Sequence, residues 1–139
     1  MSKVAVVFWS GTGNTEAMAE SVAEGARDAG AEVDIISASD FDAVKLQDYT
    51  GVALGCPAMG DEELEDSEFE PMYDEIEPLL DDVKVVFFGS YDWNDGAWMD
   101  IWRERAEEAG VNLLDSVIAK DYPDDEAKEA CKKLGATIA

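Results

Sequence analysis

The apolar and polar positions of this chain follow two spacings, which together predict strands that alternate with helices. Short and nearly continuous apolar runs, the strongest at 85–88, are typical of strands buried on both faces of a sheet. Between these runs, apolar residues recur at helical spacing, as at Met18, Val22 and Ala26. The predicted strands are 3–9, 32–36, 51–56, 83–90 and 112–119, and the predicted helices are 15–29, 41–46, 97–109 and 124–138.

This alternation predicts the α/β class, with a parallel sheet as the middle layer of a three-layer sandwich and helices on both faces. The length of 139 residues, without linker or repeat, predicts a single domain over 1–139. In such sheets ligands bind beyond the carboxyl ends of the strands, where the strand order reverses. The candidate functional loops therefore follow the first, third and fourth strands, at 10–15, 57–68 and 91–96.

The first loop has the composition of a phosphate site. It joins an apolar strand directly to a helix, which is the usual layout for holding phosphate at a helix N-terminus. Two glycines allow a tight turn, and neither the Walker pattern nor the dinucleotide glycine pattern is present. The loop contains no Lys or Arg, so backbone N–H groups and side-chain donors would hold the phosphate; the candidates are Ser10, Gly11, Thr12, Gly13, Asn14 and Thr15. A plain strand-to-helix turn with a good cap is the alternative.

The charge of the chain narrows its partners and its chemistry. There are 33 acids, 10 bases and no His, which gives a formal net charge of −23. This balance argues against nucleic acid and favours a partner with a basic surface, although acidity can also serve solubility or reflect a salty habitat. Without imidazole, and without Cys spacing for zinc, a cofactor that brings its own reactivity is expected, with no metal site.

Nothing in the sequence predicts export or a membrane. No leading basic-then-apolar segment indicates a signal peptide, and no apolar run approaches the roughly 20 residues of a membrane span. Cys56 and Cys131 do not form a disulfide framework, and we interpret them as unreactive filling. A cytoplasmic protein is expected.

The other two loops suggest a flat ligand. In the second loop Gly60 follows the thioether of Met59 and precedes three acids, and such a glycine allows a change of backbone conformation. The third loop carries Tyr91 and Trp93 where a strand has just ended, which favours stacking on a ring, with hydrophobic filling as the alternative. Trp98 and Trp102, one turn apart on the next helix, are expected in the core.

These loops together resemble those of short-chain flavodoxins, which carry FMN. The resemblance rests on Trp-Ser-Gly-Thr-Gly-Asn-Thr-Glu at 9–16, Gly-Cys-Pro-Ala-Met-Gly-Asp-Glu at 55–62 and Phe-Gly-Ser-Tyr-x-Trp at 88–93, and it covers essentially the whole chain. The fifth strand lacks the inserted loop of long-chain members. The resemblance implies a five-stranded parallel sheet of order 2-1-3-4-5.

The resemblance also implies roles for the loop residues. The first loop would bind the FMN phosphate, Met59 and Trp93 would pack on the two faces of the flavin, and Glu62 would bind its pyrimidine end. The carbonyl of Gly60 would turn toward the flavin N5–H after reduction. Ser90 and Tyr91 would lie at the carbonyl and N1 region, and the remaining expected contacts are Trp9, Pro57, Ala58, Asp61, Asp92, Gly96 and Asp121. Asp92 and Asp121 depart from the family pattern, because relatives often have glycine or a neutral residue there.

The function implied is that of a low-potential one-electron carrier, a protein without catalytic residues that shuttles FMN between semiquinone and hydroquinone states. Between 61 and 77 there are ten acids and no base, directly after the second loop. We therefore expect basic redox enzymes to dock across 61–70 onto a monomer, with charge reversal at Glu63, Glu65 and Asp66 as the test. A solvated helix face is the alternative interpretation of this acidic run.

The main alternative function is an FMN-dependent NAD(P)H quinone or nitro reductase of the same fold. The short chain and the expected capping by Trp93 argue against it, because a hydride donor needs room at the ring. A receiver domain is rejected because Ser10, Gly11, Cys56 and Pro57 replace its acids. A small tyrosine phosphatase is rejected because Glu62 stands where its loop needs Arg.

Overall fold

A computed structural model describes residues 2–11, 13–59, 63–92 and 96–139. Its centre is one sheet whose strands pair in the order β2-β1-β3-β4-β5, all parallel, which confirms the expected fold class and strand order. The strands are β1 (Lys3–Phe8), β2 (Glu32–Ser37), β3 (Gly51–Gly55), β4 (Lys84–Tyr91) and β5 (Leu113–Lys120). The helices are α1 (Asn14–Asp28), α2 (Ala43–Leu46), α3 (Phe69–Ile76), α4 (Ala97–Glu108) and α5 (Asp125–Thr137), with single 3₁₀ turns at η1 (Ala38–Asp40) and η2 (Glu77–Leu79).

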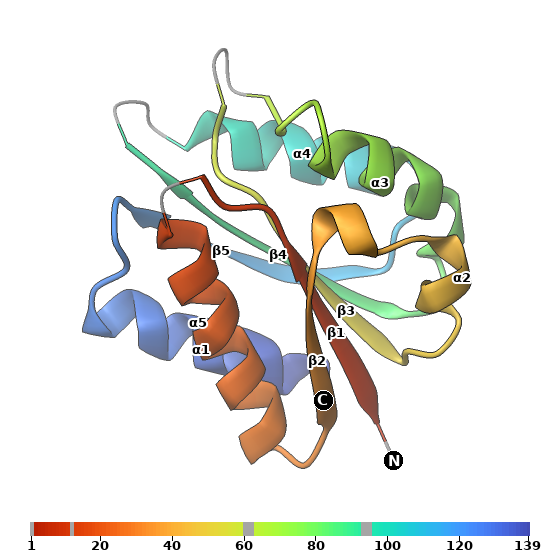
Figure 1. Ribbon diagram of the computed structural model, residues 1–139, viewed down its shortest axis with the longest axis horizontal. Helices are drawn as coiled ribbons and strands as arrows, with labels where there is room; N and C mark the ends of the chain where they lie inside the picture. The colour runs from red at the N-terminus through yellow and green to blue at the C-terminus, as the bar shows by residue number, and fades with distance from the viewer. Residues whose placement is uncertain (1, 12, 60–62, 93–95) are drawn as a thin grey trace.

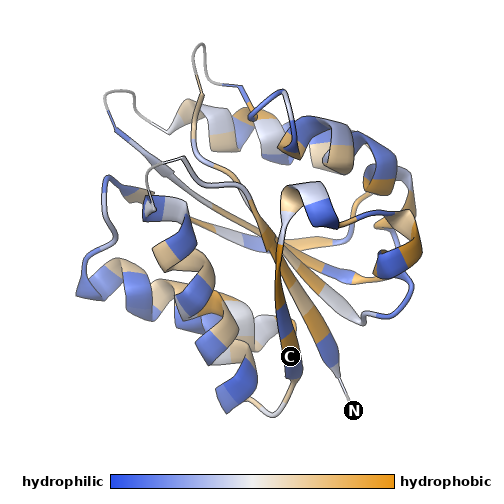
Figure 2. Ribbon diagram, viewed as in Figure 1, coloured by the Kyte–Doolittle hydropathy of each residue, from blue (hydrophilic) through white to orange (hydrophobic). Residues whose placement is uncertain are grey.

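The sheet separates two hydrophobic cores, because successive side chains of a strand point to opposite faces. In β1, Ala5 and Val7 join the core under α3 and α4, whereas Val4 and Val6 join the core under α1 and α5. The strands form the apolar centre between the two helix layers in Figures 1 and 2. A layer of helices on each face is what nearly continuous apolar strands require.

Two glycines let α1 and α5 pack backbone against backbone. A Cβ added to Gly25 would lie 1.9 Å from the carbonyl oxygen of Lys132, and one added to Gly135 would lie 2.0 Å from that of Val22. Such contacts exclude any side chain at either position. These contacts fix α1 against α5 over the stretch from Val22 to Ala26.

The helix α3 is not among the predicted helices, and a helix was expected there only as the alternative interpretation of the acidic run. Its buried residues are Phe69, Met72, Tyr73 and Ile76, which have helical spacing but are interspersed with acids. The helix packs these residues against Trp102 of α4, whose indole stacks on Phe87 at 3.7 Å between ring centroids. Trp98 and Trp102 are 1% and 2% exposed, which confirms their expected place in the core.

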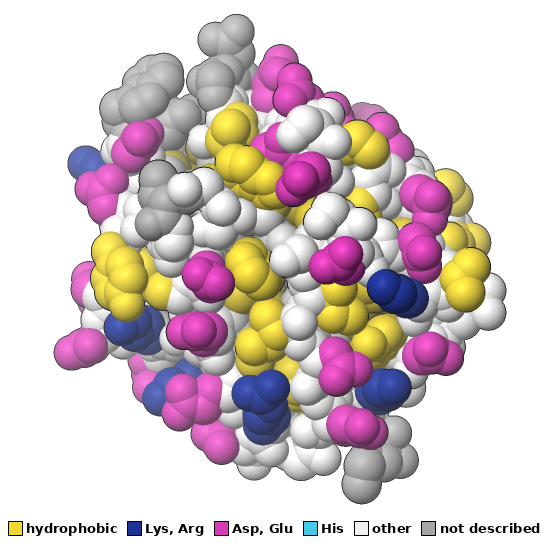
Figure 3. All heavy atoms as spheres, in the orientation of Figure 1, with side chains coloured by type: hydrophobic (Ala, Val, Ile, Leu, Met, Phe, Trp, Pro, Cys, Tyr) yellow, Lys and Arg dark blue, Asp and Glu magenta, His cyan; other side chains and the backbone are white. Residues whose placement is uncertain are grey.

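On the face shown in Figure 3, acidic side chains outnumber basic ones, and most of the basic side chains lie in the lower half of the view. None of the described helices is both long enough and apolar enough to cross a membrane. Among the same residues, no group of three or more Cys, Asp or Glu is placed to hold a metal ion.

Candidate functional site

A hollow of about 480 Å³ opens beyond the carboxyl ends of β1, β3 and β4. The described residues that line it come from all three predicted loops and from the turn after β5: Trp9, Gly11, Asn14, Pro57, Ala58, Met59, Ser90, Tyr91, Asp92 and Asp121. They include two carboxylates and no Lys or Arg. All of them were predicted as site residues, so the structure brings together segments that are far apart in the sequence.

The first loop presents a helix N-terminus to this hollow. Gly13 precedes α1 with φ of 92°, a left-handed conformation that favours glycine, and it has no side chain with which to cap the helix. Asn14 is the first helical residue and so is not the cap. The hydroxyl of Ser10 reaches over instead and accepts hydrogen bonds from the N–H groups of Gly13 (3.0 Å) and Glu16 (3.4 Å).

A buried pair of hydroxyls ties the first loop to the end of β4. The oxygens of Thr15 and Ser90 lie 2.8 Å apart, and the two residues are 1% and 4% exposed. On the other side of the loop, the indole of Trp9 lies over Gly11, where a Cβ would meet the ring at 3.1 Å. The described residues of the loop are therefore tied by contacts within the chain both to the end of β4 and to Trp9.

The second loop is closed at its neck by a pair of reciprocal backbone bonds. The N–H of Met59 donates to the carbonyl of Glu63 (3.0 Å), and the N–H of Glu63 donates back (2.9 Å). Behind the neck, the N–H of Ala58 donates to the carbonyl of Ser90 (2.9 Å), which joins the second loop to the third. Met59 is half-buried at the wall of the hollow.

The third loop and the turn after β5 complete the wall. The ring of Tyr91 packs against Trp98 with centroids 5.8 Å apart, and its carbonyl accepts from the N–H of Asp121 (2.7 Å). Asp121 has φ of 56°, in the left-handed region that Asp and Asn tolerate better than most side chains. Gly96 also has a positive φ, of 85°, and a Cβ there would meet Ile118 at 2.8 Å.

The remaining predicted contacts divide into two groups. Ser10, Gly13, Thr15 and Gly96 lie in the same loops next to lining residues, but they are not themselves part of the lining. Thr12, Gly60, Asp61, Glu62 and Trp93 lie outside the described residues, so the predicted stacking by Trp93, the turn of the Gly60 carbonyl and the role of Glu62 stay predictions.

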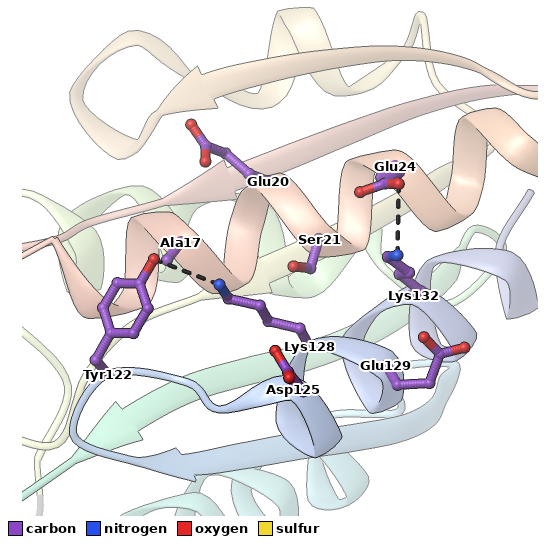
Figure 4. Close-up of a pocket in the computed structure, with 9 residues that line it drawn as sticks. All are labelled: Ala17, Glu20, Ser21, Glu24, Tyr122, Asp125, Lys128, Glu129 and Lys132. Atoms are coloured by element: carbon purple, nitrogen blue, oxygen red, sulfur yellow. Dashed lines mark hydrogen bonds and ion pairs between the residues drawn. The ribbon is translucent and has the colours of Figure 1, made fainter.

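A second hollow, of about 420 Å³, lies between α1 and α5 and shares no lining residue with the first (Figure 4). Its two lysines already have partners: the amine of Lys132 lies 3.4 Å from a carboxylate oxygen of Glu24, and that of Lys128 lies 3.5 Å from the hydroxyl of Tyr122. Carboxylates otherwise dominate its lining. A phosphate compound therefore fits the hollow at the strand ends better.

From the sequence, Glu65 was placed wrongly and Arg105 was given no role, and both residues shape the region around the second loop and α3. Glu65, which we had placed on an exposed docking surface, is only 4% exposed. Arg105 of α4 binds three carboxylates of α3 and of the residue that follows it, those of Glu70 (3.2 Å), Glu77 (3.2 Å) and Asp74, so three of the ten acids between 61 and 77 are already paired within the chain. The signal for Glu65 was its place just before a helical apolar pattern, where carboxylates favour a helix start.

The cysteines behave as expected. Burial raises the pKa of the Cys56 thiol to about 12, against a smaller opposing effect of its hydrogen bond from the N–H of Glu65. Burial likewise raises the pKa of Cys131 to about 12. Neither forms a thiolate near neutral pH, which fits their interpretation as unreactive filling.

Comparisons with known proteins agree with this architecture. The flavodoxin family profile matches residues 6–135. The chain is 43% identical to a flavodoxin of Megasphaera elsdenii over 136 residues, 98% of each chain, and 43% identical to one of Clostridium beijerinckii over 134 residues, 96% of this chain and 97% of the relative. The solution structure of two-electron reduced Megasphaera elsdenii flavodoxin superposes with a TM-score of 0.87 at 42% identity, covering 96% of this chain and 98% of that one. The chain therefore belongs to the flavodoxin family, whose members are electron-transfer proteins that carry FMN.

Proposed function

We propose that this chain is a low-potential carrier of single electrons and that FMN occupies the hollow at the strand ends. When bound, FMN supplies a flat ring that takes up and releases electrons one at a time. The observation that carries the proposal is the meeting of a cation-free helix N-terminus with an apolar and aromatic wall in one hollow. Its volume of about 480 Å³ lies within the range of roughly 300–1,000 Å³ typical of small-molecule sites.

The first loop fits a phosphate because it offers hydrogen-bond donors and a positive dipole end without a cation. The hydroxyl of Ser10 accepts from the backbone, so its own hydrogen remains to be donated to a phosphate oxygen. The backbone of Gly11 and Gly13, the amide of Asn14 and the hydroxyl of Thr15 would complete the set. Met59, Trp9 and Tyr91 would border the ring.

Negative charge at the rim supports a low potential. A carboxylate about 12 Å from a buried anion, at an effective dielectric constant of about 40, raises the energy of the anion by roughly 0.7 kcal/mol, which lowers a one-electron potential by about 30 mV. Asp121 allows a clean test, because Asn also tolerates its left-handed backbone. Asp121→Asn should raise the lower midpoint potential by about 30 mV, and an unchanged potential would contradict this role of the rim.

The reductase alternative has less support. The two relatives that match over nearly the whole chain at 43% identity are flavodoxins. Purified protein loaded with FMN should not oxidise NADH or NADPH at a steady rate by itself. Steady turnover of either dinucleotide would favour the reductase.

We further propose that partners with a basic surface dock on an acidic rim formed by Glu63 and Asp66. These residues are exposed beside the second loop, and none of the ion pairs among the described residues involves them. The acids further along α3 contribute less, because Arg105 already binds three of them. A partner with a positively charged surface would associate with this rim faster than a neutral partner, and the association rate would rise with the negative charge on the rim.

A charge-reversal experiment tests this docking surface. Glu63→Lys with Asp66→Lys should lower the rate of electron transfer to a basic haem protein such as mitochondrial cytochrome c and flatten its dependence on ionic strength. The matched control is Glu32→Lys with Glu107→Lys, which makes the same change in net charge away from the strand-end edge. Equal effects of the two double variants would mean that net charge alone, and not this rim, governs the encounter.

We also propose that the carrier works as a monomer in the cytoplasm. The net charge of −23 opposes association of two copies, and the strand-end edge must stay open to partners. Light scattering at physiological salt should give the mass of one chain.

A further inference from the structure

The carboxylate of Glu65 is buried at the junction of the second loop and α3, and the electron-transfer chemistry does not use it. It is 4% exposed in a chain whose other described acids are mostly at the surface. Its oxygens accept from the N–H groups of Ser67 (2.9 Å), Glu68 (2.8 Å) and Phe69 (2.8 Å), and also from the hydroxyl of Ser67. All of these partners are donors, and they include the N–H groups that begin α3.

The backbone of the same residue is bonded in two further directions. Its N–H donates to the sulfur of Cys56 (3.3 Å), and that thiol donates to the carbonyl of Pro57 (3.4 Å). Its carbonyl accepts from the N–H of Glu70 (2.8 Å). Glu65 therefore links the first residues of the second loop to the first turn of α3, two positions beyond the neck that Met59 and Glu63 close.

We propose that Glu65 is a positioning residue whose anionic carboxylate fixes the neck of the second loop, at Met59 and Glu63, in the position that receives the flavin ring. This inference rests on the proposed function, because the loop is expected to contact FMN through Met59 and its neighbours. Three sets of contacts in the described structure support this inference. They are the cap that the Glu65 carboxylate forms on α3, the bond from its N–H to Cys56, and the closed neck at Met59 and Glu63.

The site requires a carboxylate and not an amide. A carboxylate offers only acceptors, which match the four donors around it, whereas the amide of Gln replaces one oxygen by an NH₂ group that would face a donor. Burial by itself would raise the pKa of Glu65, but the hydrogen bonds from Ser67, Phe69 and Glu68 outweigh it and leave the pKa lowered. The anion is thus the form for which the surroundings are arranged.

The test compares Glu65→Gln with Glu68→Gln. Both remove one negative charge within three positions of each other, but the side chain of Glu68 is exposed and caps nothing. Glu65→Gln should weaken FMN binding about tenfold or more and speed amide exchange at Met59 and Glu63 in the apo protein. Glu68→Gln should change affinity less than about twofold and leave these amides protected.

A redox readout separates positioning from charge. The midpoint potentials report the ratio of affinities for reduced and oxidised FMN, and this ratio should change about threefold more in Glu65→Gln than in Glu68→Gln. Equal ratios and equal exchange in the two variants would overturn the inference.

A second variant serves if Glu65→Gln does not fold. Ser67→Ala removes a single donor to the Glu65 carboxylate, and it should shift amide exchange and FMN affinity the same way by a smaller factor. Exchange and affinity equal to those of the wild type in Ser67→Ala would then overturn the inference. Failure of the wild-type protein to bind FMN would instead overturn the proposed function.

Discussion

The hydroxyl pair that joins Thr15 to Ser90 should be energetically coupled. The two oxygens are 2.8 Å apart and both residues are almost fully buried, so neither hydroxyl can exchange its partner for water. Thr15→Val keeps the shape of the side chain and removes its hydroxyl. Ser90→Ala removes the other partner, and the double variant removes both.

The expected magnitudes follow from this burial. A buried hydrogen bond contributes about 0.5–1.5 kcal/mol net, but leaving one partner buried and unsatisfied costs about 1–3 kcal/mol. Each single substitution should therefore destabilise the apo protein by about 1–3 kcal/mol, whereas the double variant leaves no orphan. We expect the double variant to be less destabilised than the sum of the two single variants by about 1 kcal/mol.

Urea unfolding without FMN measures these values free of any contribution from ligand binding. Thr137→Val is a control, because Thr137 is exposed and its hydroxyl bonds to the backbone carbonyl of Leu134. Additive single-variant effects would refute the coupling. FMN affinity gives a second readout: if Ser90 donates to Thr15, the hydrogen of Thr15 is available to the phosphate, and Thr15→Val should lose more affinity than Ser90→Ala.

Three further predictions concern the rest of the fold. Arg105→Met should destabilise the protein by about 1–2 kcal/mol more than Arg103→Met, because it removes the same charge together with three partly exposed ion pairs on α3; equal unfolding midpoints would contradict this. Gly135→Ala should cost at least about 2 kcal/mol, because the added methyl group would meet the carbonyl of Val22 at 2.0 Å; wild-type stability would show that the helices separate freely. The stabilisation by Glu65 relative to Glu65→Gln should be fully present at neutral pH and lost as pH falls below 4.5 and through the lowered folded-state pKa. Urea midpoints from neutral pH into the acid range measure it, and a difference that grows on acidification would contradict the sign.

The architecture was predictable because local and global signals agree. The apolar run of β4 can only be a strand buried on both faces, and parallel strands bring their carboxyl ends to one edge. That geometry predicts that the loops after β1, β3 and β4 meet at one edge, whereas the assignment of Trp9 and Asp121 to the same site came from the resemblance to flavodoxins.

The sequence was less informative where tertiary contacts decide a residue's role. The helix α3 was left out of the predicted helices because acids between its apolar residues hide the helical spacing, and Arg105 of another helix binds three acids of that run. Glu65 looks like its exposed neighbours in the sequence. Its place before the helical apolar pattern favours a helix start, but its burial depends on the contact with Cys56 behind the neck at Met59 and Glu63, which is a long-range arrangement.

A reductive titration tests the central claim most directly. The protein is purified, reconstituted with FMN and titrated anaerobically with dithionite while its absorption spectrum and potential are recorded. The account predicts a tightly bound yellow cofactor that takes up its two electrons in separate one-electron steps, the second at low potential. A protein that retains no FMN, or one that takes up both electrons together and oxidises NADPH by itself, would contradict it.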